Sequence, residues 1–225
     1  MKDLFDDIIK GLSEAMPLEE VVLPPELART RYPFGALELV CRNWRSERLH
    51  KVYAMLMKVK VPSLNILGMA FHPEPCYDIP LFQFDLTGAK KKIIAYINVM
   101  APRDEDAGGR SSLALFEPLR RRYAHLHPFK MAEWMEAYNT ACTVYVDPEP
   151  ARLDDLKACV REYFGLYLQL LVKAEKINDP GRIAATERFH EAYKNDLITK
   201  DRSQIMLGKV IGKEKAGRIF REVLI

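Results

Sequence analysis

The residues best suited to acid–base chemistry lie in one segment, Phe71–Asp85. Three prolines, Pro73, Pro75 and Pro80, occupy its centre. Proline fixes its own backbone angle and disfavours helix at the preceding residue, so this stretch is predicted to be a rigid, extended loop. The chain then continues as a strand, which means that the loop holds the next side chains at a defined position.

The strand predicted over Leu81–Thr87 carries an aspartate near its middle. Side chains alternate along a strand, so Gln83 and Asp85 share one face, and Phe82 and Phe84 share the other. Aspartate is disfavoured inside strands. Two interpretations follow. Either Asp85 is a solvated residue on a half-exposed sheet, or it is a carboxyl group at the floor of a pocket.

Other candidate groups are sparse in this sequence. His72 stands at a strand end, where a histidine more often makes a structural hydrogen bond than acts as an acid or a ligand. The sequence contains no His-Glu-x-x-His pair, glycine-rich phosphate loop or nucleophile elbow, so no bound nucleotide, flavin or metal is expected. The four cysteines lack the spacing of a metal site, and we expect reduced thiols at Cys41, Cys76, Cys142 and Cys159.

Composition indicates one folded domain over residues 1–225, because the chain is 48% hydrophobic and 29% charged. A formal net charge of +3 without a dense basic tract argues against nucleic-acid binding. No apolar run reaches the length of a membrane span, and the N-terminus is acidic, so we expect a cytoplasmic protein without a membrane anchor. Two basic runs, Lys90–Lys92 and Arg120–Arg122, are either solvated faces or contacts for an acidic protein or ligand carboxylates.

The elements that position Asp85 follow from periodicity. Apolar residues over Leu4–Leu12 share one helical face, and a proline-rich connector follows at Pro17–Pro33. The next segments are joined by connections too short for crossover helices, which favours an antiparallel sheet. Its strands are predicted at Leu37–Trp44, Leu49–Val59, Leu64–His72, Leu81–Thr87 and Lys92–Val99.

The second half of the chain is mostly helical. A polar loop at Arg103–Arg110 leads into it, and one further strand is expected at Ala141–Val146. A run of strands followed by a run of helices predicts a layered α+β fold. The helices are predicted at Ser112–Tyr123, Lys130–Tyr138, Arg152–Val172, Arg182–Tyr193, Ser203–Ile211 and Lys213–Leu224.

The segment from His72 to Asp85 resembles the signature of the ferredoxin-dependent bilin reductases, which is a strand followed by Phe-Pro-x-Pro-x-Tyr-Asp-x-Pro-x-Phe-x-x-Asp. His72 takes the place of the phenylalanine. The segment Lys200–Leu207 and the end of the chain resemble the closing motif of the family, so the likeness spans about Leu49 to the C-terminus. The residues that match the central signature in register are Pro73, Pro75, Tyr77, Asp78, Pro80, Phe82 and Asp85.

This resemblance implies a three-layer α/β/α sandwich with a central antiparallel sheet, in which biliverdin IXα lies between the sheet and the C-terminal helices. It implies an enzyme without a bound cofactor that takes single electrons from reduced [2Fe-2S] ferredoxin and passes through bilin radicals. Asp85 on the sheet side and Asp201 on the helix side are then the expected proton donors for making a phytobilin. We expect a monomer, with substrate contacts at Gly68, Phe82, Gln83, Asn98 and Arg202.

Two departures from the family bear on the product. Members that make phycocyanobilin carry a histidine where this chain has Gly68, and a glutamate where the gapless register gives Leu56. These differences speak against a four-electron reductase of the phycocyanobilin type, while the double bond reduced stays open. Two alternatives remain at this point: a non-catalytic bilin- or tetrapyrrole-binding protein, and a reductase of a linear chlorophyll catabolite.

Overall fold

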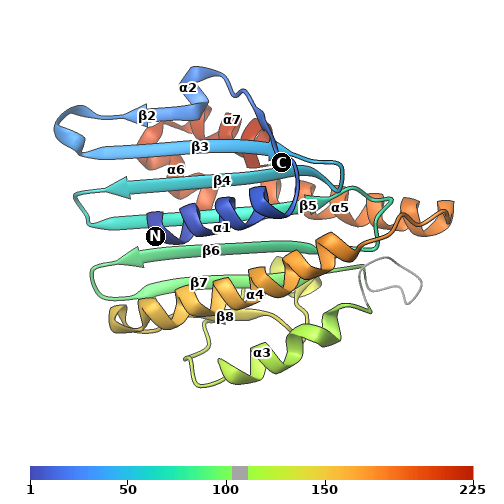
Figure 1. Ribbon diagram of the computed structural model, residues 1–225. Helices are drawn as coiled ribbons and strands as arrows, with labels where there is room; N and C mark the ends of the chain where they lie inside the picture. Colours follow the sequence, from blue (N-terminus) through green and yellow to red (C-terminus); the bar gives the residue numbers. More distant parts are fainter. Residues whose placement is uncertain (103–110, 225) are drawn as a thin grey trace.

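An antiparallel sheet forms the middle layer of the molecule (Figure 1). The computed structural model describes residues 1–102 and 111–224, so the loop expected at Arg103–Arg110 lies outside the described residues. Neighbouring strands follow the order β1-β3-β4-β5-β6-β7-β8, and β2 also pairs with β3. The strands are β1 (Glu19–Val21), β2 (Arg29–Arg31), β3 (Leu37–Arg45), β4 (Leu49–Val59), β5 (Leu64–Pro73), β6 (Leu81–Ala89), β7 (Ile93–Met100) and β8 (Val144–Val146).

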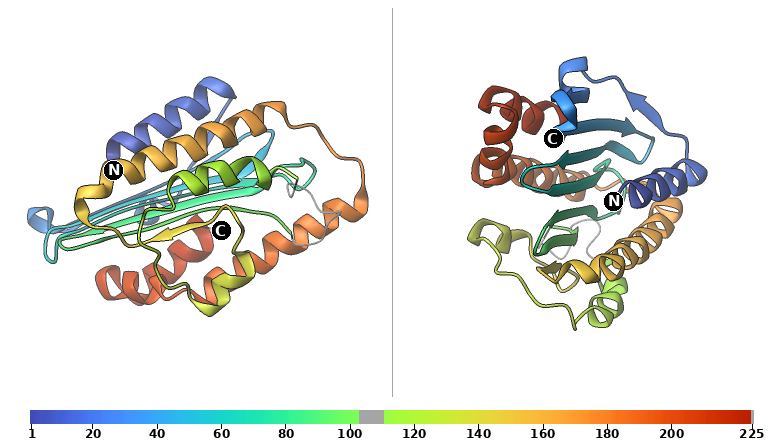
Figure 2. Two further views of the ribbon diagram at one scale, coloured as in Figure 1. Left: turned by 90° about the horizontal axis from the view of Figure 1, so that it is seen from below. Right: turned by 90° about the vertical axis from the view of Figure 1, so that its left-hand side faces the viewer.

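One face of the sheet is covered by helices α1 (Lys2–Ala15) and α4 (Leu153–Lys173), with α3 (Glu117–Arg122) beside them (Figure 2). The packing there is apolar and largely aromatic. The ring of Phe82 lies 5.4 Å from that of Phe71 and 5.1 Å from that of Tyr167 on α4, measured between centroids. This layer holds β5 and β6 rigidly in place from behind, because buried aromatic side chains contribute large apolar contact areas.

The other face of the sheet carries the C-terminal helices α5 (Pro180–Lys200), α6 (Ser203–Ile211) and α7 (Lys213–Arg218), followed by a π-helical turn at Ile219–Leu224 (Figure 2). The C-terminal segment is tied to the sheet, because the buried Asn43 of β3 donates a hydrogen bond to the Val223 carbonyl oxygen at 3.1 Å. Helices on both faces of an antiparallel sheet confirm the predicted α+β fold and its three layers.

Several predicted boundaries were wrong at short elements. The connector at Pro17–Pro33 contains β1, β2 and a short helix, α2 (Pro25–Ala28). Three-residue edge strands are too short to show alternation, which is why the sequence pattern missed them. The predicted start of the last strand at Ala141 was also wrong, since residues 140–143 form a turn in which the Thr143 amide donates to the Thr140 carbonyl at 3.1 Å.

The predicted helices also differ in length and type. The one at Ser112–Tyr123 is a 3₁₀ turn (Leu113–Phe116) joined to α3, and the one at Lys130–Tyr138 is a 3₁₀ helix (Glu133–Tyr138). Helix α5 begins earlier than predicted because Asp179 caps it, accepting hydrogen bonds from the next amides, and Pro180 takes the first helical position. Among residues 1–102 and 111–224, no helix is both long and apolar enough to span a bilayer.

Candidate active site

Asp85 lies in the middle of the sheet, on the face covered by the C-terminal helices. On β6 it pairs with Gly68 of β5 on one side and with Tyr96 of β7 on the other. A Cβ atom at position 68 would stand closer to Asp85 Oδ1 than any real van der Waals contact. The carboxyl group therefore leans over the backbone of Gly68, and the missing side chain is what makes room for it.

Two hydrogen bonds fix the orientation of this carboxyl group. Gln83, two residues earlier on the same face, donates from Nε2 to Asp85 Oδ2 at 2.6 Å. The hydroxyl group of Tyr193 on α5 donates to Gln83 Oε1. Both the oxygen and the nitrogen of the Gln83 amide are therefore held by hydrogen bonds. Through Gln83, the position of Tyr193 on α5 determines the orientation of the Asp85 carboxyl group.

Burial makes Asp85 a proton-holding group near neutral pH. Loss of solvation raises the pKa of Asp85 to about 7, the negative charge of Asp201 adds to this effect, and the hydrogen bond from Gln83 opposes it. Asp85 nonetheless remains only half-buried by surface accessibility. The carboxyl group is therefore accessible to a bound molecule, and its pKa leaves a proton available near neutral pH. A general acid requires both properties.

Asp201 approaches the same region from the helical layer, at the C-terminal end of α5. Its Oδ1 accepts a hydrogen bond from the Ser203 amide at 2.8 Å. Burial raises the pKa of Asp201, and the hydrogen bonding from Ser203 works against that rise. One acid on the sheet and one on the helices can therefore serve opposite sides of a flat molecule placed between them.

Tyrosines surround the two acids. Tyr53 of β4, Tyr96 of β7 and Tyr145 of β8 have raised pKa values, in each case because of burial first and the negative charges of Asp85 or Asp201 second. Tyr96 and Tyr145 are opposite each other in the ladder, and their rings meet edge to face with centroids 5.6 Å apart. These phenols stay protonated at neutral pH, so they supply hydrogen-bond donors to the site.

Asn98 supports this site but is not free to bind a substrate. Its Nδ2 donates to Tyr96 Oη at 2.8 Å and to the Tyr138 carbonyl at 2.9 Å. Its Oδ1 accepts from the hydroxyl groups of Thr143 and Thr140, at 2.8 and 3.2 Å. All four hydrogen-bonding positions of this fully buried amide are occupied, so the expected substrate contact is replaced by a role in positioning Tyr96.

The structure brings together Gly68, Gln83 and Asp85, places Asn98 opposite Gln83 in the ladder, and leaves Phe82 and Arg202 elsewhere. Phe82 lies on the opposite face of the sheet in the aromatic layer against α4, because neighbouring residues of a strand point to opposite sides. Its predicted place beside the substrate is therefore wrong. Arg202 is exposed at the start of α6, next to Asp201.

The pairing of β4 with β5 decides which residue of β4 lies beside Gly68. Met55, not Leu56, pairs with Gly68, and it lies on the Asp85 face. Leu56 packs against the layer formed by α1 and α4. The β4–β5 turn sets this register, which counting residues along the chain does not reveal.

Sequence reasoning missed Tyr193 and Tyr96, which touch the two sides of the Gln83–Asp85 pair. For Tyr96 a signal existed, since alternation along the strand predicted at Lys92–Val99 places it on the same face as Asn98. For Tyr193 the only signal was a helical spacing of buried residues, Thr186, His190, Tyr193 and Leu197, and half of these are polar enough to pass for solvent-exposed positions.

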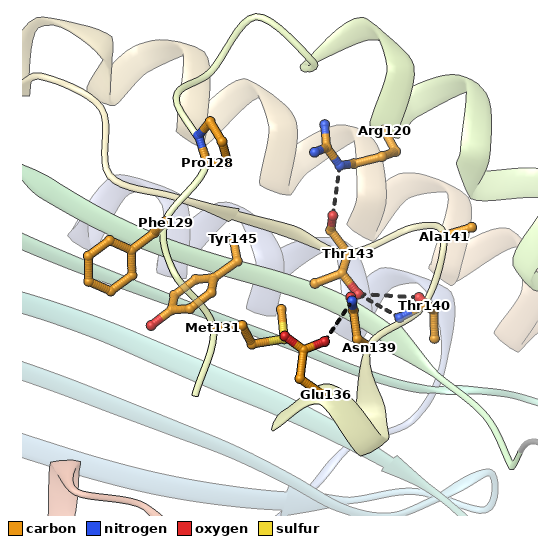
Figure 3. Close-up of a pocket in the computed structure, with 10 residues that line it drawn as sticks. All are labelled: Arg120, Pro128, Phe129, Met131, Glu136, Asn139, Thr140, Ala141, Thr143 and Tyr145. Atoms are coloured by element: carbon orange, nitrogen blue, oxygen red, sulfur yellow. Dashed lines mark hydrogen bonds between the residues drawn. The ribbon is translucent and has the colours of Figure 1, made fainter. Parts of the chain in front are cut away.

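A cavity of about 420 Å³ adjoins this site at the edge strand β8 (Figure 3). Tyr145 lies on one side of it and the segment from Glu136 to Thr143 on the other. Arg120 reaches over the rim and donates from Nε to the Thr143 carbonyl at 2.7 Å. A volume of this size is within the range of small-molecule sites, and Tyr145 connects it to the charges of Asp85 and Asp201.

The two basic runs differ in how far their charges are already paired. Arg121 and Arg122 lie 3.9 and 2.7 Å from the carboxylates of Glu117 and Glu162. Lys90 and Lys91 are exposed in the turn between β6 and β7. Within the part of the chain that the structure describes, no group of His, Cys, Asp and Glu is arranged to hold a metal ion.

Comparison with known proteins gives one consistent family. The family model for ferredoxin-dependent bilin reductase matches residues 5–225. The chain is 24% identical over 232 residues to the 15,16-dihydrobiliverdin:ferredoxin oxidoreductase of Nostoc punctiforme, covering 99% of this chain and 93% of that protein. It is 21% identical over 208 residues to the phycocyanobilin:ferredoxin oxidoreductase of Trichodesmium erythraeum, covering 88% and 80% of the two chains.

The fold is also shared with a solved structure. Phytochromobilin synthase from tomato, determined in complex with biliverdin, superposes with a TM-score of 0.86 at 16% sequence identity. The match covers 97% of this chain and 80% of the tomato chain. Sequence and fold therefore agree on the family that the motif around Asp85 first indicated.

Proposed function

Because the chain belongs to the family of ferredoxin-dependent bilin reductases, we propose that it reduces biliverdin IXα to a phytobilin with electrons from reduced [2Fe-2S] ferredoxin. Membership makes it an enzyme, an oxidoreductase of bilins. One observation carries the proposal for this chain. Asp85 places a carboxyl group in the middle of a sheet face that helices cover, and burial raises the pKa of Asp85 to about 7.

The pigment lies on the Asp85 face of the sheet, beneath α5 and α6. Support comes from the exposure that remains there: Met55, Ile66 and Asp85 are only half-buried, although helices cover this side of the sheet. Gly68 leaves room beside them for the Asp85 carboxyl group, which lies over its backbone on this face. The cavity beside Tyr145 extends this region toward β8.

Asp85 acts as the first proton donor. Each electron that enters the conjugated pigment makes its carbon and nitrogen atoms more basic, so a carboxylic acid within hydrogen-bond reach then protonates it. General-acid catalysis of this kind contributes about 10²–10⁴-fold in rate. Gln83 and Tyr193 keep the donor in one orientation, which selects the position on the pigment that receives the proton.

Asp201 acts as the second donor, from the helical side of the pigment. Its pKa is raised by burial, as is that of Asp85, and the two charges repel each other. Ionisation of one acid therefore favours retention of the proton on the other. Two protons, one from each side, accompany a two-electron reduction.

The product differs from phycocyanobilin on this proposal. The Asp85 face has Gly68 where the phycocyanobilin-forming members carry histidine, and Met55 is the neighbour of Gly68 on β4. Neither position therefore carries an imidazole or a further carboxyl group. Among the residues that the structure describes, Asp201 is the acid whose charge acts on Asp85. We assign the enzyme a two-electron reduction.

The ferredoxin contact is proposed at Lys90–Lys92. Lys90 and Lys91 are exposed, whereas the arginines of the second run are engaged with Glu117, Glu162 or the Thr143 carbonyl. An acidic partner gains most from charges that the protein has not already neutralised. Lys92 contributes less, since it lies 3.7 Å from the carboxylate of Asp147.

An anaerobic assay tests the proposal directly. Purified protein, biliverdin and reduced ferredoxin are mixed, the products are separated by chromatography, and their molecular masses are measured by mass spectrometry. A product heavier than biliverdin by two hydrogen atoms is expected, formed by the parent and by Asp154→Asn, an exposed control on α4. Absence of any reduced bilin would refute the function. A reduced product formed at the parent rate by Asp85→Asn would refute the assigned donor.

A further inference from the structure

Three histidines meet beneath α5, outside the group formed by Asp85, Gln83 and Tyr193. His50 comes from β4, His72 from β5 and His190 from α5. The ring centroids of His50 and His72 are 5.7 Å apart, and those of His50 and His190 are 6.1 Å apart. His72 and His190 are almost completely buried, while His50 is half-buried. The cluster therefore leads from the surface to the interior.

The ring nitrogens in this cluster are unusually poor in partners. Neither nitrogen of His72, nor Nδ1 of His190, makes a hydrogen bond within the protein. His50 does, since its Nδ1 lies 3.0 Å from the Pro73 carbonyl oxygen. Burial of an imidazole whose nitrogens make no hydrogen bond destabilises the folded protein. Packing alone therefore does not explain these histidines, and we infer that they have another role.

The surroundings of His72 keep it neutral. Burial lowers its pKa most, followed by the neighbouring His50 and His190 and by the charges of Lys51 and Lys194. Burial likewise lowers the pKa of His190, to about 3, and that of His50. A neutral imidazole has one donor and one acceptor nitrogen. It can accept a proton on one side and release one on the other without storing charge.

The charged groups around the cluster come from each packed element. Strand β4 supplies Lys51, helix α5 supplies Lys194, and Glu74 follows β5 and opposes the fall in the His50 pKa. Lys194 is itself paired with Glu191, which follows His190 on α5, at 3.0 Å. No cation site is indicated, since the described residues contain no metal-binding arrangement of His, Cys, Asp and Glu.

Tyr53 links the cluster to the acids. Its ring centroid lies 6.2 Å from that of His72. In the sheet, Tyr53, Ala70 and Gln83 form one row across β4, β5 and β6, so Tyr53 lies on the same face as the Gln83–Asp85 pair. Burial raises the pKa of Tyr53 most, and the charges of Asp85 and Asp201 add to this effect. Tyr193 provides a second connection, because it follows His190 by one helical turn and bonds to Gln83, which bonds to Asp85.

A proton donor beneath a bound pigment needs a supply that does not pass through the pigment. We propose that His50 and His72, with His190 packed against His50, form a proton path that returns protons from solvent to Asp85 under α5. For each proton that Asp85 gives to the substrate, one proton from water enters at His50, passes through His72 and reaches the Asp85 carboxylate by way of Tyr53. The electrons from ferredoxin do not use this path. The inference rests on the proposed function, in which Asp85 is the donor.

The test separates the first proton transfer from its renewal. In His72→Phe, the ring keeps its packing but loses its nitrogens. The first protonation in a single turnover should stay within about twofold of the parent, because Asp85 already holds its proton. Steady-state turnover should fall at least roughly tenfold, with a larger solvent deuterium effect, because renewal has become limiting. His125→Phe, at an exposed site, is the matched control and should behave as the parent.

Chemical rescue distinguishes a relay from a structural role. His72→Ala leaves a space of the shape of the lost ring, so added imidazole should restore much of its turnover, whereas the filled His72→Phe site should not respond. Parent turnover in both variants, or a loss that includes the first protonation and resists imidazole, would overturn the proton path. Failure of the parent itself to reduce biliverdin would instead refute the proposed function.

Discussion

Asp85→Asn should remove proton donation and, at alkaline pH, make the protein more stable. The amide keeps nearly the same shape, and its carbonyl oxygen can still accept the hydrogen bond from Gln83. What it loses is the titratable proton. Function and stability are therefore expected to change in opposite directions at this single position.

The size of the stability change follows from the pKa of Asp85, which burial raises from 3.8 to about 7. A raised carboxyl pKa means that the folded state holds a proton that the unfolded chain has released. The parent therefore loses stability as pH rises from near 4 to about 7 and is level above that. At 1.36 kcal/mol for each pKa unit, roughly three units correspond to about 4 kcal/mol as an upper bound.

The measurement is urea denaturation of the parent and of Asp85→Asn at pH 5 and pH 9. The variant should exceed the parent in unfolding free energy by up to about 4 kcal/mol at pH 9, and by clearly less at pH 5. Asp154→Asn changes the same group at a side chain that is 96% exposed and should show no such pH dependence. Parallel pH profiles for the parent and Asp85→Asn would refute the reasoning that the carboxyl group is desolvated.

The same variant tests whether Asp85 is the proton donor. In anaerobic single-turnover spectroscopy, the parent should protonate the reduced pigment more slowly as pH rises through about 7, because the donor becomes ionised. Asp85→Asn should bind biliverdin nearly as well, since binding comes mostly from burying the large apolar pigment. It should then stall with a bilin radical.

Three further changes test the rest of the site. Gly68→Ala places a Cβ against Asp85 Oδ1 and should slow the first protonation by roughly tenfold to a hundredfold, whereas Gly165→Ala meets nothing within 4 Å; equal rates would contradict the close approach. Asn98→Ala breaks four hydrogen bonds and should lower the unfolding free energy by about 3 kcal/mol in urea denaturation, and a loss under about 1 kcal/mol would count against its positioning role. Reversing the charges of Lys90–Lys92 should raise the KM for ferredoxin, more at low salt than at high salt, and an unchanged KM would reject that surface.

The sequence is sufficient to predict the main strands of the sheet and the shared face of Gln83 and Asp85, because both depend on short-range regularities. Alternation along one strand is a strict property of its geometry, so Gln83 and Asp85 were placed together correctly. The prolines of Phe71–Asp85 made the motif rigid enough to be matched without a gap. The antiparallel order followed from connections that are too short for crossover helices.

Relations between distant segments could not be predicted in the same way. Which residue of β4 lies beside Gly68 depends on the turn between β4 and β5, and in the structure it is Met55 and not the neighbouring Leu56. Tyr193 is more than one hundred residues from Gln83, and no local pattern connects the two. Asn98 is an expected substrate contact in the sequence, and only its four partners reveal that it positions Tyr96.

The buried side of α5 is unusually polar for a helix that packs against a sheet. A helix retained for stability alone buries an apolar stripe, yet α5 buries Thr186, His190 and Tyr193 together with one leucine, Leu197. Such a face contributes little hydrophobic free energy and leaves His190 Nδ1 without a partner. The aromatic layer against α4 supplies the missing rigidity from the other side of the same strands. Buried polar residues that weaken packing without a structural gain are expected at functional sites. On α5, the polar residues His190 and Tyr193 lie on the side of the helix that faces the Asp85 region.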